Sequence, residues 1–169
     1  MGMFMASVAF RCDDKQVWMS VKPEIMNMFA GIRGLSSNLD SEGPGYVILS
    51  PYGDMGKVLS DMPERISALT GDYAVFALCN DSDFNMMELY HNGSMLESSC
   101  IGEVYEEFAE FMEVNPPDLN LWKQLLLDPT QEQALEAALL QVEVCSEDNL
   151  RELSRLTGLP IFDDSLMFP

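Results

Sequence analysis

Two aspartates separated by one residue, Asp81 and Asp83, follow an apolar run at residues 73–79. If the chain stays extended, both carboxylates point to one side, where they could hold Mg²⁺ or Ca²⁺. A calcium-binding loop would need glycine at its sixth position and a bidentate glutamate at its twelfth, but Met86 and Asn92 stand there. The pair therefore suggests a metal-dependent phosphatase-like hydrolase, with a polar strand end as the non-catalytic interpretation.

The other residue types that commonly carry catalysis do not form a pattern. His91 is the only histidine, and it adjoins a predicted turn without an evident nucleophile. The four cysteines include no Cys-x-x-Cys pair, so neither a zinc site nor a redox dithiol is indicated, and a reducing cytoplasm is the expected location. No phosphate-binding glycine motif occurs. We therefore assign no catalytic residues and expect no cofactor.

The charge balance is the unusual feature of the composition. The chain has 28 acidic and 9 basic residues, which gives a formal net charge of −19. Polyanions and anionic membrane surfaces need a basic footprint, so the sequence argues against nucleic acid and against membrane binding. The acidity is also uneven, because residues 97–169 contain 16 acidic and only 3 basic side chains.

One acidic segment has a spacing that is typical of a helix face. Its five glutamates are Glu103, Glu106, Glu107, Glu110 and Glu113. In a helix they would share one face without a lysine or arginine, and each like-charge pair would cost about 0.2 to 0.5 kcal/mol. A sequence that tolerates this cost could gain a docking surface for a basic partner protein. The alternative is a solvated face that is kept acidic for solubility.

Hydrophobic patterning predicts several strands in the first part of the chain. Residues 73–79 are apolar on both faces, which indicates a central strand. The Asn92-Gly93 dipeptide predicts a tight hairpin between residues 86–90 and 95–99. Further elements are expected as follows: strands at residues 3–10, 16–21 and 46–50, and helices at residues 23–32 and, interrupted by Pro63, between residues 53 and 71.

After residue 102 the pattern becomes helical. Apolar stripes predict helices at residues 104–112, 119–127, 130–142 and 146–157. The expected fold class is α+β, a mixed or mainly antiparallel sheet packed by helices, with a helical C-terminal third. The expected organisation is a single domain over residues 1–169, with a strand-rich part at 1–100 and a helical part at 101–169.

Two resemblances bear on function. The Asp81-x-Asp83 pair after a buried strand, with Asp163-Asp164 as a second acidic pair, is similar to the haloacid dehalogenase pattern, although it lies mid-chain and lacks the Lys and Thr motifs between. Asp81-Ser-Asp83, Leu89-Tyr90, Asn92-Gly93 and residues 153–160 together resemble small acidic bacterial proteins that are similar to immunity proteins of toxin systems. This second resemblance implies that an acidic surface blocks a basic toxin.

Three functions are thus expected candidates. The first is a non-enzymatic protein-binding module whose acidic surface meets a basic partner, with an immunity-type inhibitor as its special case. The second is the metal-dependent hydrolase that uses Asp81 and Asp83. The third is an oligomeric structural protein.

Overall fold

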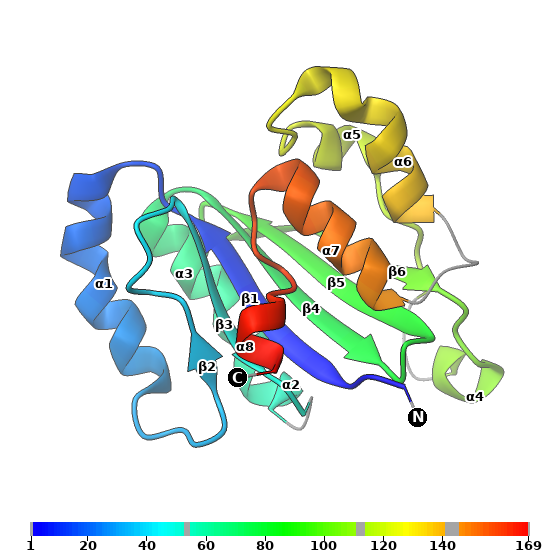
Figure 1. Cartoon of the computed structure of the whole chain (residues 1–169), viewed down its shortest axis with the longest axis horizontal. Coiled ribbons are helices and arrows are strands. Elements are labelled where there is room, and N and C mark those ends of the chain that lie inside the picture. Colours follow the sequence, from blue (N-terminus) through cyan, green and yellow to red (C-terminus); the bar gives the residue numbers. More distant parts are fainter. Residues whose placement is uncertain (1, 53–54, 111–113, 141–145, 169) are drawn as a thin grey trace.

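The strand that begins the fold, β1 (Met5–Arg11), lies inside a six-stranded sheet (Figure 1). The computed structural model describes residues 2–52, 55–110, 114–140 and 146–168. The strand order in this part of the chain is β2-β3-β1-β4-β5-β6, and every pairing is antiparallel. The other strands are β2 (Ser36–Ser37), β3 (Gly45–Ser50), β4 (Tyr73–Asn80), β5 (Phe84–His91) and β6 (Ser94–Gly102).

The two central strands, β1 and β4, are buried on both faces of the sheet. In β1 the side chains of Met5 and Ala9 join one core, whereas Val8 and Phe10 join the other. The β4 strand alternates in the same way, and its pairing with β1 begins at Met5 opposite Cys79. The prediction that residues 73–79 form a central strand is therefore confirmed.

Helices cover both faces of this sheet (Figure 1). On one face, α1 (Lys15–Phe29), α2 (Gly56–Ser60) and α3 (Pro63–Thr70) contribute Trp18, Ile25, Leu59 and Ile66 to the core. The other face is covered by the C-terminal helices α5 (Leu119–Lys123), α6 (Glu132–Leu140), α7 (Ser146–Thr157) and α8 (Asp164–Met167). The protein is thus α+β with helices in its C-terminal part, as predicted. None of the helices in the described residues is long and apolar enough to cross a bilayer.

A half-buried carboxylate fastens α5 to the sheet edge. Glu97 of β6 accepts hydrogen bonds from the Trp122 indole N–H at 2.7 Å and from the backbone N–H of Asp118. Burial raises the pKa of Glu97, against the effect of these two donors. Trp122 itself is fully buried in the core that contains Met5 and Ala9, under the C-terminal helices.

Tight turns join β4, β5 and β6. Asn92 and Gly93 both have positive φ angles, 48° and 81°, so the predicted Asn-Gly hairpin is confirmed. A second turn of this kind joins β4 to β5, where Asp81 and Ser82 have φ angles of 52° and 61°. The Asp83 N–H donates to the Asn80 carbonyl at 3.0 Å and closes this turn.

The strand predicted at residues 16–21 is wrong, because these residues form the first half of α1. Asp14 caps the helix, and its carboxylate accepts hydrogen bonds from the N–H groups of Gln16 at 2.8 Å and Val17 at 3.3 Å. Pro23 lies inside the helix and does not begin it. Trp18 and Ile25 are spaced two helical turns apart, which places both on the buried side of the helix.

Removing the helix cap should destabilise the protein. We expect Asp14→Ala to lower the free energy of unfolding by about 1 kcal/mol, because two N–H groups lose their acceptor. Asp13→Ala is the matched control, since the exposed Asp13 side chain accepts no hydrogen bond from the described part of the chain. Urea unfolding measures both variants, and equal losses would contradict the capping role.

Candidate functional site

The structure places Asp81 and Asp83 in the turn between β4 and β5. An extended chain is the condition under which both carboxylates would point to one side, and the chain is not extended here, because Asp81 and Ser82 adopt left-handed backbone conformations. Each aspartate already accepts a hydrogen bond from the protein: Asp81 from the Gly2 N–H at 2.8 Å, and Asp83 from the Tyr105 hydroxyl at 3.0 Å. In the residues that the structure describes, no three His, Cys, Asp or Glu side chains come together as metal ligands would.

The other acidic pair has separate structural tasks. Asp163 caps α8 by accepting from the Ser165 N–H at 3.0 Å. Asp164 forms an ion pair with Arg151 of α7 at 3.0 Å, and Asp148 pairs with the same guanidinium at 2.7 Å. Both residues therefore serve the packing of the C-terminal helices.

The acidic segment after β6 lies against the β4–β5 turn. Its backbone is held there by the Glu103 N–H, which donates to the Asp83 carbonyl at 3.2 Å, and by the Tyr105 hydroxyl on the Asp83 carboxylate. The structure thus brings the two predicted sites together, although they come from different parts of the chain. This contact was not predicted, because the local sequence pattern does not indicate which distant segment packs against the β4–β5 turn.

The helix in this segment is shorter than predicted. The described helix α4 spans only Glu106–Ala109, so Glu103 precedes it and Glu110 follows it. Glu113 lies outside the described residues. The glutamates from 103 to 110 are all exposed, and none of the ion pairs in the described part of the chain includes one of them.

We call this group the acidic surface: Asp81, Asp83, Glu103, Glu106, Glu107 and Glu110, with Tyr105 among them. The Tyr105 ring is 46% exposed. Its hydrogen bond to Asp83, followed by the charges of Asp83, Glu103 and Asp81, raises the pKa of the phenol. Tyr105 is therefore surrounded by negative charge that no nearby cation of the described chain offsets.

An apolar hollow adjoins the acidic surface. It has a volume of about 640 Å³ and shares Ser82 with the β4–β5 turn. Three aromatic side chains at its wall are exposed to solvent, namely Phe4, Tyr52 (77%) and Phe168 (65%). Large apolar side chains are seldom exposed together on a protein surface unless they contact a partner.

A buried polar cluster lies behind this hollow and holds α7 against the turn. The Ser146 N–H donates to the Ser82 carbonyl at 3.1 Å, and the Asn85 amide donates to the Ser146 carbonyl at 2.7 Å. The Cys79 sulfur lies 3.2 Å from the Ser146 hydroxyl. Burial raises the pKa of the Cys79 thiol, so this thiol stays protonated and acts as a small core residue.

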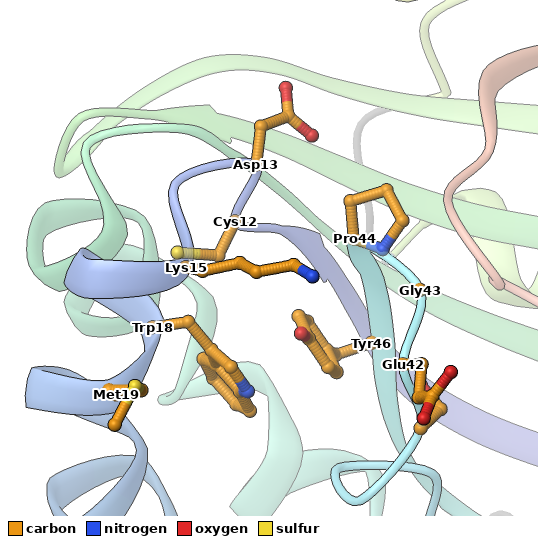
Figure 2. A pocket seen from close by; sticks show the side chains of 10 residues that line it. Cys12, Asp13, Lys15, Trp18, Met19, Glu42, Gly43, Pro44 and Tyr46 are labelled. Carbon is orange, nitrogen blue, oxygen red and sulfur yellow. The ribbon is translucent and has the colours of Figure 1, made fainter.

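A separate pocket opens at the opposite end of the sheet, where β1 ends and β3 begins (Figure 2). It has a volume of about 630 Å³, and the residues around it include Cys12, Asp13, Lys15, Trp18, Glu42 and Tyr46. The sequence interpretation missed it, because residues 16–21 were assigned to a strand. A helix over these residues would have placed Trp18 beside the strand that carries Tyr46.

The one histidine has a packing role in this structure. The His91 ring lies 4.3 Å from the Tyr73 ring, centroid to centroid, across the paired strands β4 and β5. Its place at the end of β5 is as predicted, beside the hairpin turn. No cysteine is described next to it that could serve as a nucleophile, since Cys12, Cys79 and Cys100 are buried elsewhere.

The environment of Tyr105 gives a direct test of the acidic surface. We expect Asp83→Asn to lower the pKa of the Tyr105 phenol, because the variant removes the charge that most favours the protonated form. NMR titration of ring-labelled tyrosine measures the shift, with Tyr105→Phe for assignment. Glu136→Gln, an exposed change on α6, should leave the titration unchanged. A Tyr105 pKa that is the same in Asp83→Asn would refute the contact.

No protein-family model matches the chain, and no curated protein or solved structure matches it. A functional assignment therefore has to be built from the molecule's own geometry. That geometry offers two places: the acidic surface with the apolar hollow at one end of the sheet, and the pocket around Trp18 and Tyr46 at the other.

Proposed function

We propose that this protein is a non-enzymatic binding module that docks a basic partner protein on the acidic surface and the apolar hollow. The observation that carries the proposal is the meeting, at one end of the sheet, of exposed aromatic rings with carboxylates that form no ion pair in the described part of the chain. Such a combination provides both long-range attraction and contact area for a partner.

Most basic side chains outside the acidic surface have an acidic partner. Six of the nine lysine and arginine side chains form ion pairs within the described residues, as in Lys22 with Asp40, Arg65 with Glu24 and Lys123 with Glu132. The acidic surface has no such pairing among the described residues. Its field is therefore directed outward, where it would speed the encounter with a basic protein and disfavour acidic ones.

The apolar hollow supplies the contact that charge alone lacks. Exposed carboxylates add little affinity by themselves, because water and salt screen them. Aromatic residues at the centre of an interface commonly provide most of the binding energy, inside a polar rim. Phe4, Tyr52 and Phe168 fit the central role, and the carboxylates of the neighbouring turn fit the rim.

Two earlier expectations fit this proposal. Inhibition of a basic toxin, the role implied by the resemblance to immunity proteins, is one form of docking on an acidic surface. The free thiols of Cys12, Cys79 and Cys100 support a reducing, cytoplasmic location. Nucleic acid is disfavoured as a partner, since phosphates would meet the same negative field.

Charge reversal at the acidic surface should remove binding selectively. We expect Glu106→Lys with Glu107→Lys to weaken partner binding and to flatten its salt dependence, because the complementary field is lost. The control is Asp61→Lys with Glu136→Lys, which changes the net charge equally at exposed positions outside the site. Proteins captured on the wild type and on both double variants would be identified, and the association kinetics of each candidate measured at several salt concentrations.

A third variant examines the apolar hollow. Tyr52→Ala should increase the dissociation rate more than it slows association, since this exposed ring contributes contact and no charge. If a partner binds both double variants and the wild type equally well, the acidic surface is not the docking site. If both double variants lose the same partner affinity, the net charge of the protein and not the acidic surface accounts for binding.

A further inference from the structure

The pocket at the other end of the sheet is built from two segments that are held together. Cys12 lies directly after β1, and its N–H donates to the Pro44 carbonyl at 2.9 Å. This hydrogen bond fixes the loop that carries Glu42 against the start of α1. Both walls of the pocket are therefore tied to the sheet, and the pocket is largely preformed.

Stacked aromatic rings form one side of the pocket. The rings of Trp18 and Tyr46 lie 4.0 Å apart, centroid to centroid, with an interplanar angle of 20°, and Phe10 packs behind both. The two rings are buried, so they are held in place by packing. The small part of each ring that lines the pocket is rigid and apolar, and it lies next to Met19 at the rim.

Three hydrogen-bond donors at this pocket have no partner among the residues that the structure describes. In the described part of the chain, neither the Trp18 indole N–H nor the Tyr46 hydroxyl is hydrogen-bonded, and neither is shut off from solvent. The Lys15 ammonium forms no ion pair there, and Figure 2 shows its side chain reaching across the pocket above Tyr46. Burial raises the pKa of Tyr46, so its hydroxyl remains a donor at neutral pH.

Acidic side chains at the same pocket limit the charge of the ligand that it can bind. Asp13 and Glu42 line it, and neither forms an ion pair within the described residues. A simple anion would meet these carboxylates and the net charge of −19. A simple cation would meet Lys15. A ligand that carries both an ammonium and a carboxylate satisfies both groups at once.

We propose that this pocket binds a free α-amino acid with an apolar side chain. The ligand's carboxylate would accept from Lys15 and from Tyr46 or Trp18, and its ammonium would be attracted by Glu42, which Figure 2 shows on the other side of the Lys15 side chain from Asp13. The apolar side chain would lie against the aromatic rings. The volume of about 630 Å³ falls in the usual range for small-molecule sites.

The proposal is for binding and not for catalysis. The Cys12 thiol lines the pocket, and burial, with the negative charges of Asp72, Asp14 and Asp13, raises its pKa. The thiol therefore stays protonated and unreactive near neutral pH. The site also lies at the far end of the strands from the acidic surface, so it does not depend on the proposed docking of a partner.

Calorimetric titration with three related compounds tests the ligand class. The probes are phenylalanine, phenethylamine, which lacks the carboxylate, and 3-phenylpropionate, which lacks the ammonium. We expect phenylalanine to bind. Each truncated compound should bind with an affinity lower by about tenfold or more, since each loses one charged contact. Trp18 fluorescence should respond as well, whereas Trp122 is buried in the other core.

Two pairs of variants locate the contacts. Lys15→Met should weaken the binding of phenylalanine and 3-phenylpropionate but not that of phenethylamine. Glu42→Gln should weaken the binding of phenylalanine and phenethylamine but not that of 3-phenylpropionate. Their controls are Lys57→Met and Glu136→Gln, which make the same changes at exposed positions away from the pocket. The proposal is overturned if phenylalanine does not bind at millimolar concentration, if a truncated compound binds as well, or if the controls behave like the pocket variants.

Discussion

The rest of the structure depends on the pairing of β1 with β4, two strands that are buried on both faces. An antiparallel sheet can leave one face to solvent, but one whose central strands are apolar on both sides needs two covering layers. The helices α1 to α3 supply one layer and α5 to α8 the other. With both faces covered, the surface near the central strands that remains for ligands lies at the strand ends, which is where both candidate sites occur.

The sequence was most informative where one local rule decided the structure. The strand β4 could be predicted because residues on both of its faces are apolar, which is typical of a central strand. The β5–β6 hairpin could be predicted because Asn92 and Gly93 tolerate positive φ at the two central turn positions. In each case no distant contact was needed.

Errors arose where two local patterns compete. Residues 16–21 contain β-branched and aromatic side chains that suit a strand, but the Asp14 cap and the spacing of Trp18 and Ile25 favour a helix. Proline is common in the first turn of a helix, whereas Pro23 lies within this one. The helix predicted in the acidic segment is too long for a similar reason. Glutamates favour helix formation, and the periodicity of the sequence does not show the segment's contact with the β4–β5 turn.

The two tight turns of β4, β5 and β6 also bear on the order of assembly. These three strands pair with neighbours that are adjacent in sequence, so their contacts close short loops. The strand β1 must instead find β3 and β4 far along the chain, at a greater entropic cost of loop closure. We expect the β4–β6 meander to gain hydrogen-exchange protection early in refolding. The insertion of β1, which completes both cores at once and gives β3 its main partner, then becomes the slow and cooperative step, and pulse-labelled exchange would show β1 and β3 protected last.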